Sequence, residues 1–193
     1  MPAYNEEKNI ESVVKQWYPI VEKTGNGSCL FVINDGSTDA TSVVLEGLQK
    51  KYPLLLTENR TNVGHGATIH YAYRKAIEAG ATYVFQTDSD GQTDPNDFWT
   101  FWENRTAYDF QIGVRKARQE GCSRIFATRV LRLLLFFLFG KWIKDPNTPF
   151  RLMKTARLSA VLKHIPDNLF LCNVAISVIL VAWNERFRWV PVS

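Results

Sequence analysis

Residues 82–95 read Thr-Tyr-Val-Phe-Gln-Thr-Asp-Ser-Asp-Gly-Gln-Thr-Asp-Pro. The first six are rich in β-branched and aromatic side chains, which is typical of a buried strand. Asp88, Asp90 and Gln92 follow at alternate positions, and a short turn after a strand can point all three into one crevice. Oxygen ligands of this kind suit Mg²⁺ or Mn²⁺. A polar turn before a helix is the simpler interpretation, and this stretch alone does not decide between the two.

Strands and helices alternate along the chain around this stretch. Apolar residues at a helical spacing predict a helix over residues 5–23, and the apolar run at 29–33 predicts a strand covered on both faces. The same patterns predict further helices at 40–51 and 65–79 and further strands at 54–57 and 82–87. This order is typical of an α/β fold with a mainly parallel central sheet flanked by helices.

Polar clusters follow three of the predicted strands, at residues 2–6, 34–39 and 88–92. In a parallel sheet, ligands bind beyond the carboxyl ends of the strands. The shared position strengthens the metal interpretation and suggests a nucleotide diphosphate, which needs base, ribose and phosphate contacts from separate loops. A P-loop is missing, and residues 64–66 lack the third glycine of a dinucleotide fingerprint because Ile69 stands there. The sequence therefore argues against hydride transfer.

The composition is that of one globular domain. The chain has 193 residues, of which 46% are apolar and 22% charged, and a formal net charge of +4. That charge is small for binding a phosphate backbone, so we expect no nucleic-acid partner. The three cysteines lie in apolar runs without metal spacing and are expected to be reduced core thiols. The three histidines form no cluster, and we expect each to be structural or on the surface.

Both ends of the sequence predict a single domain, residues 1–193, that is incomplete. Residues 1–7 are typical of the turn after a strand whose body is missing, and the chain stops just beyond a predicted strand at 186–192. No signal peptide is predicted, and the longest apolar run is too short to span a bilayer. Residues 122–144 combine Phe and Leu with arginines, lysines and a tryptophan. Such a segment suits a helix in a membrane interface, and a core-packing helix with solvated arginines fits it equally well.

Taken together, the motifs resemble those of family 2 glycosyltransferases with the GT-A fold, in particular the polyprenyl-phosphate branch. The matching stretches occur in the family's order and span almost the whole chain. They are Pro2-Ala3-Tyr4-Asn5-Glu6-Glu7, Asn34-Asp35-Gly36-Ser37-Thr38-Asp39, Asp88-Ser89-Asp90-Gly91-Gln92, Gly113-Val114-Arg115 and Pro149-Phe150-Arg151. The resemblance implies an inverting, metal-dependent transfer of a hexose from a nucleotide-diphosphate sugar to a dolichyl or undecaprenyl phosphate.

The resemblance also implies roles for individual residues. The nucleotide sugar would be bound by Pro2, Tyr4, Glu6, Asp35, Asp88 and Ser89. Mg²⁺ or Mn²⁺ would be held by Asp88, Asp90 and Gln92. The acceptor phosphate would be held by Arg115, Arg124 and Thr128, and the catalytic residues would be Asp90, Arg115 and Arg124. By charge alone, Arg118, Arg129 and Arg151 are further candidates on the acceptor side.

Two positions depart from the family pattern. Asn34 stands where the family usually has an acid, and Asn173 stands where many enzymes with hydroxyl acceptors have a general base. A lipid phosphate is already ionised near neutral pH and needs no base, so Asn173 favours a lipid-phosphate acceptor. Two alternatives stay open, namely transfer to a glycan or protein hydroxyl and a non-catalytic domain that binds nucleotide sugars. The expected location is peripheral, on the cytoplasmic face of a membrane.

Overall fold

The computed structural model describes residues 1–25, 27–115, 130, 133, 136–137, 140 and 142–193. The strands are β1 (Pro2–Ala3), β2 (Leu30–Asp35), β3 (Leu55–Arg60), β4 (Tyr83–Gln86), β5 (Phe110–Arg115), β6 (Arg151–Lys154) and β7 (Phe187–Val192). The helices are α1 (Ile10–Thr24), α2 (Thr41–Lys51), α3 (His65–Glu78), α4 (Phe98–Glu103), α6 (Thr155–Leu162) and α7 (Cys172–Ala182), and the 3₁₀ turn η1 (Pro95–Asp97) precedes α4. The alternation of strands and helices that the sequence predicts is confirmed.

The described strands form two hydrogen-bonded sheets. One has the order β1-β2-β3, and all its strands are parallel. The other has the order β4-β6-β5-β7, in which β6 runs antiparallel to both neighbours and β7 runs parallel to β5. The chain enters β6 opposite the carboxyl end of β4 and the middle of β5, where Arg151 pairs with Gln86 and Ile112, and β6 runs antiparallel to both strands from there. The second sheet is therefore mixed, which the sequence did not predict.

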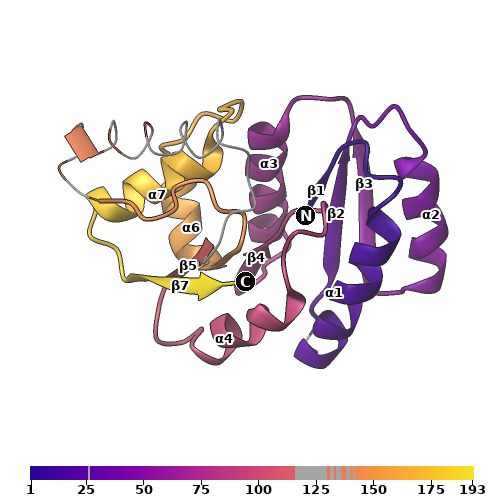
Figure 1. The fold of residues 1–193 in the computed structure, drawn as a ribbon, viewed down its shortest axis with the longest axis horizontal. Coiled ribbons are helices and arrows are strands. Elements are labelled where there is room, and N and C mark those ends of the chain that lie inside the picture. The colour runs from indigo at the N-terminus through magenta and orange to yellow at the C-terminus, as the bar shows by residue number, and fades with distance from the viewer. Residues whose placement is uncertain (26, 116–129, 131–132, 134–135, 138–139, 141) are drawn as a thin grey trace.

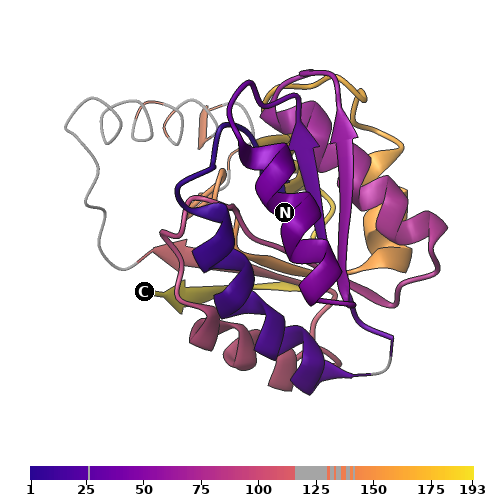
Figure 2. The same ribbon diagram turned by 90° about the vertical axis from the view of Figure 1, so that its right-hand side faces the viewer.

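Helices cover both faces of the sheets (Figure 1). Figure 2 shows the same arrangement from the side, with α1 and α2 on one side of β2 and β3 and with α3 on the other. The core on the first face is built from buried residues of α1, α2 and α4, among them Trp17, Leu45 and Phe101. The core on the second face is built from α3, α6 and α7, among them Ile69 and Ile176. The fold is therefore a three-layer α/β arrangement.

An aromatic cluster fixes β4 between α1 and α4. The ring of Phe85 in β4 lies 4.7 Å from Phe150, 5.0 Å from Phe98 and 5.4 Å from Trp17, measured between centroids. Phe101 is fully buried and packs edge-on against Phe85 and Phe150. Edge-to-face pairs add to the free energy gained by burying the rings. This packing holds the strand that leads directly into Asp88.

Most of the predicted amphipathic segment, residues 122–144, lies outside the described residues. Among those described, Phe137 is 80% exposed and Trp142 is 53% exposed, and Phe136 contacts both rings. No helix in the described part of the chain is long and apolar enough to cross a membrane. That residues 1–193 form one incomplete domain stays a prediction.

We expect Phe101→Ala to lower the free energy of unfolding by about 3–5 kcal/mol, because it opens a cavity in a fully buried aromatic cluster. Urea denaturation followed by circular dichroism measures the change. Val43→Ala is the matched control, because the Val43 side chain is 71% exposed and its truncation should cost less than about 0.5 kcal/mol. Equal losses for both variants would show that the cluster does not support the fold.

Candidate functional site

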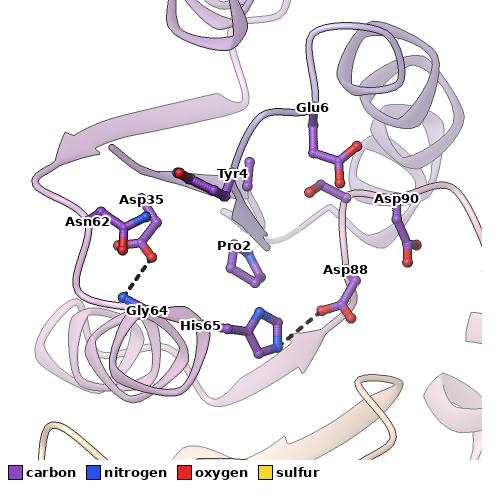
Figure 3. Close-up of a pocket in the computed structure, with 11 residues that line it drawn as sticks. Pro2, Tyr4, Glu6, Asp35, Asn62, Gly64, His65, Asp88 and Asp90 are labelled. Carbon is purple, nitrogen blue, oxygen red and sulfur yellow. Dashed lines mark hydrogen bonds and ion pairs between the residues drawn. The ribbon is translucent and has the colours of Figure 1, made fainter. Parts of the chain in front are cut away.

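A pocket of about 420 Å³ opens beyond the carboxyl ends of β1, β2 and β4 (Figure 3). All six residues predicted to bind a nucleotide sugar line it, and so does the predicted metal ligand Asp90. The six are Pro2, Tyr4, Glu6, Asp35, Asp88 and Ser89. Figure 3 shows Asp35 at one end of the pocket and Asp88 and Asp90 at the other, with Pro2 and Tyr4 between them. The polar clusters that follow β1, β2 and β4 therefore line one concave site, as their shared position at the strand ends predicts.

At one end of the pocket, the Asp35 carboxylate holds the loop that follows β3. Asp35 is 3% exposed, and its two oxygens accept hydrogen bonds from the backbone N–H groups of Val63 (3.1 Å) and Gly64 (3.0 Å). Gly64 has a positive φ of 89°, which glycine adopts without strain. Helix α3 then begins at His65. Each carboxylate oxygen keeps a second lone pair, so Asp35 can still accept a hydrogen bond from a ligand.

The loop after β1 is tied to the loop after β2, and these ties position Tyr4 and Glu6. Asn5 accepts a hydrogen bond from the backbone of Thr38 (2.8 Å), and its own N–H donates to the hydroxyl of Ser37 (2.9 Å). The N–H of Glu6 donates to Thr41 Oγ1 at 2.8 Å. Asn5 has a φ of 55°, outside the helical range. For this reason α1 starts later than the sequence predicts, and the preceding residues form the pocket wall.

Asn34 has a structural role rather than a contact with the pocket. Its Nδ2 donates to Asn59 Oδ1 at 2.9 Å, and its Oδ1 accepts from the backbone of Ser37 at 3.1 Å. The side chain is buried and joins β2 to β3 and to the turn that follows β2. An amide can donate and accept at once, whereas a carboxylate only accepts. The departure from the family's two acids therefore serves the scaffold here.

At the other end of the pocket, Asp88 and Asp90 supply carboxylates. Asp90 Oδ1 accepts the backbone N–H of Gln92 at 3.0 Å. Asp88 Oδ1 is excluded from solvent and has no hydrogen-bond partner among the described residues, and His65 Nε2 lies 3.9 Å from it. Burial raises the pKa of Asp88, the charge of Asp90 raises it further, and His65 and Arg115 oppose the shift. A desolvated carboxylate oxygen without a partner needs a hydrogen-bond donor or a nearby positive charge to compensate it.

A divalent cation fits this end of the pocket. No group of three or more His, Cys, Asp or Glu side chains surrounds a common point in the described part of the chain. Two neighbouring carboxylates nevertheless suit Mg²⁺ or Mn²⁺, which take their remaining ligands from water and substrate phosphates. Gln92 is exposed and does not line the pocket. Its role as a third ligand stays a prediction.

The acceptor side of the predicted site is only partly described. Arg115 ends β5 and is partly exposed, while Arg124 and Thr128 lie outside the described residues, as do the secondary candidates Arg118 and Arg129. Arg151 is fully buried and donates to the carbonyl oxygens of Thr148 and Pro146, both at 2.7 Å. It therefore supports the turn before β6 from inside, and the expectation that it assists at the acceptor side is wrong.

Asn173 lies in the interior rather than in the pocket wall. It is 2% exposed, and its Oδ1 is 3.5 Å from the hydroxyl of Tyr73. The same hydroxyl donates to the side chain of Gln86 in β4. Asn173 thus contributes a buried amide that lies near Tyr73 and Gln86. It offers no carboxylate that could act as a general base for an acceptor.

Asn62, Gly64 and His65 also line the pocket, and none of them was assigned a role from the sequence. They follow β3, whose carboxyl end lies at the same edge as those of β1, β2 and β4. From the sequence, residues 64–66 were considered only as a dinucleotide fingerprint, whose third glycine they lack. The signal that could have identified them was their position after a strand end, the same argument that was used for the other three loops.

Comparison with known proteins now gives the family. The family model described as glycosyl transferase family 2 matches residues 1–159. The chain belongs to this family. Dolichyl-phosphate beta-glucosyltransferase ALG5D of Trichomonas vaginalis is 27% identical over an alignment of 215 positions, which covers 96% of this chain and 64% of that protein. Undecaprenyl-phosphate 4-deoxy-4-formamido-L-arabinose transferase of Pectobacterium atrosepticum is 24% identical, over 84% of this chain and 50% of that protein. The chain thus spans between half and about two thirds of the length of these relatives.

Solved structures confirm the GT-A fold of this family 2 glycosyltransferase chain. Glucosyl-3-phosphoglycerate synthase of Mycobacterium tuberculosis, crystallised with Mn²⁺, UDP and glucosyl-3-phosphoglycerate, superposes with a TM-score of 0.70 at 18% identity, over 99% of this chain and 67% of that chain. S. aureus TarS 1–349 gives a TM-score of 0.63 at 18% identity, over 98% of this chain and 56% of that chain. At such identities the likeness concerns the fold.

We expect Gly36→Ala to destabilise this family 2 chain more than Gly80→Ala. Both glycines have a φ near +70°, so both substitutions carry the cost of a left-handed alanine, about 1–2 kcal/mol. A Cβ on Gly36 would also lie 2.5 Å from the backbone nitrogen of Asn62, whereas nothing lies within 4 Å at Gly80. The difference in unfolding free energy, measured in urea, isolates this contact. Equal losses would show that the Asn62 loop is free to move away.

Proposed function

We propose that this chain is the donor-binding and catalytic part of an inverting glycosyltransferase that moves a hexose from a nucleotide-diphosphate sugar to a polyprenyl phosphate. The observation that carries the proposal is the single pocket in which loops after β1, β2 and β4 bring a buried Asp35 and the pair Asp88 and Asp90 together. Membership of glycosyl transferase family 2 supports it. So do relatives whose names specify dolichyl-phosphate and undecaprenyl-phosphate transferases.

The two ends of the pocket bind different parts of the donor. Asp35 and Asn62 hold the nucleoside at one end, and Tyr4 and Pro2 line the space between the ends. Asp88 and Asp90 hold Mg²⁺ or Mn²⁺ at the other, next to the diphosphate. When bound, the cation neutralises the charge that develops on the leaving diphosphate. The structural neighbour crystallised with Mn²⁺ and UDP supports a divalent ion at such a site.

The acceptor attacks the anomeric carbon from the face opposite the leaving diphosphate, which inverts the configuration. A phosphate oxygen is already anionic, so no residue has to remove a proton from it. This requirement agrees with Asn173, a buried amide at the position where a base was sought. Arg115, together with Arg124 and Thr128, holds the acceptor phosphate. Arginine suits this task because its planar guanidinium binds phosphate oxygens in pairs.

The lipid chain of the acceptor requires contact with a membrane surface. Phe137 and Trp142 expose most of their ring surface, and Phe136 connects the two. Aromatic rings at this density suit the boundary between lipid headgroups and acyl chains. We therefore place these three residues against the membrane, on its cytoplasmic face, where nucleotide sugars are available.

The direct test is incubation of the protein with radiolabelled UDP- and GDP-hexoses and undecaprenyl or dolichyl phosphate, with and without EDTA. Labelled lipid should form and should disappear with chelator. We expect Asp90→Asn to lower kcat/KM by at least about 100-fold, because it removes a carboxylate from the cation. Glu46→Gln removes an exposed carboxylate on α2 outside the pocket and should leave turnover unchanged.

Each rival function has its own outcome in this experiment. Transfer to a free glycan or a protein hydroxyl, with no labelled lipid, would replace the phosphate acceptor with a hydroxyl acceptor. Calorimetric binding of UDP or GDP without any transfer would indicate a non-catalytic nucleotide-sugar-binding domain. Equal turnover with and without EDTA would contradict the metal assignment.

We expect the double variant Phe137→Ser, Trp142→Ser to bind phospholipid vesicles at least about tenfold more weakly than the unmodified chain, because two exposed aromatic contacts with lipid are lost. Co-sedimentation with vesicles of neutral and anionic lipid measures the partition coefficient. Val43→Ser is the control, because Val43 is 71% exposed on α2 and lies outside this segment. Equal binding by all three proteins would place the membrane contact elsewhere.

A further inference from the structure

His65 occupies a central place in the pocket. It lines the pocket, and its side chain is 47% exposed. Figure 3 shows the imidazole below Pro2, between the Asp35 end and the Asp88 end. Its Nε2 points toward Asp88 and lies 3.9 Å from Oδ1. The imidazole is therefore partly exposed and lies on the wall of the pocket rather than in the core.

The backbone at the start of α3 is held from two directions. On one side, the N–H of Gly64 donates to Asp35 Oδ2 at 3.0 Å. On the other, Gly66 packs so closely against the loop before α7 that a Cβ there would collide with the carbonyl oxygens of Leu169 and Phe170. His65 lies between these two anchored glycines. The scaffold therefore holds the backbone that carries the imidazole beside Asp88.

Asp88 Oδ1 is a group that needs a partner. It is excluded from solvent and accepts no hydrogen bond within the described residues. A carboxylate oxygen that is excluded from solvent and makes no hydrogen bond destabilises the folded chain. The 3.9 Å between His65 Nε2 and Asp88 Oδ1 exceeds a hydrogen-bond distance of about 3 Å, so a hydrogen bond requires the two side chains to move closer together. Carboxylates that bind metals are usually held by such a hydrogen bond on the oxygen that the metal does not use.

We propose that His65 is a positioning residue: its Nε2–H donates to Oδ1 of Asp88 and so holds the carboxylate in the orientation in which its other oxygen binds the divalent cation. This inference rests on the proposed function, because it assumes that a cation binds at Asp88 and Asp90. The imidazole acts through Asp88 and touches neither the cation nor the sugar. A side chain with an N–H donor in the same place should therefore replace it, and an aliphatic one should not.

The test compares His65→Ala, His65→Leu and His65→Gln with the unmodified chain by calorimetric titration of Mn²⁺ in the presence of UDP, and separately of GDP. We expect the alanine and leucine variants to bind Mn²⁺ about 10- to 100-fold more weakly, and the glutamine variant to retain most of the affinity. His164→Gln is the matched control, because this exposed histidine packs on Trp183 outside the pocket and should have no effect. Thermal unfolding checks that each variant is folded.

The outcomes separate this inference from the proposed function. Normal Mn²⁺ affinity in His65→Ala and His65→Leu would overturn the role of His65 while leaving the donor site intact. An equal loss in His65→Gln would overturn the hydrogen bond as the cause. A weaker affinity for UDP or GDP measured in EDTA, with unchanged Mn²⁺ affinity, would show a direct donor contact and overturn the positioning role. Failure of the unmodified chain to bind Mn²⁺ would overturn the metal site of the proposed function and this inference with it.

Discussion

The hydrogen bonds that the Asp35 carboxylate accepts from Val63 and Gly64 determine where the pocket forms. Asp35 is almost fully buried, and a buried carboxylate without partners would cost several kcal/mol. Charge-assisted bonds to two backbone N–H groups offset that cost, each contributing about 1.5–3 kcal/mol. The loop after β3 therefore cannot swing outward without leaving the charge unpaired. This one constraint sets the start of α3 and places Asn62, Gly64 and His65 in the wall.

The early part of the fold could be predicted because its signals are local. The apolar run of β2 and the helical spacing in α1, α2 and α3 are each written in consecutive residues, and parallel strands bring their polar ends to one edge. The antiparallel course of β6 could not be predicted, because it depends on where a distant turn re-enters the sheet. The pairing of Arg151 with both Gln86 and Ile112 shows this dependence. No periodicity within β6 itself carries that information.

The site residues follow the same division. Pro2, Tyr4, Glu6, Asp35, Asp88, Ser89 and Asp90 were identified from motifs, and all lie on the pocket, although their chemical roles stay predictions. His65 was assigned to a structural or surface role because a lone histidine carries no spacing signal; its relation to Asp88 arises only when α3 and β4 are packed together. Asn34 shows the reverse case: the sequence marked it as a departure from the family, and only its bonds to Asn59 and Ser37 show that it serves the scaffold.

The carboxylates of Asp35 and Asp88 differ in a way that bears on function. Asp35 has hydrogen-bond donors for both oxygens, so its charge is used to build the site. Asp88 has an oxygen without a donor, and its raised pKa, caused chiefly by burial, records that the scaffold leaves this charge poorly compensated. Replacing such a group, or giving it a hydrogen-bond partner, would be expected to stabilise the folded chain. Under the proposed function, a divalent cation and the diphosphate of the donor would lie beside Asp88 and Asp90, and their binding would compensate this charge.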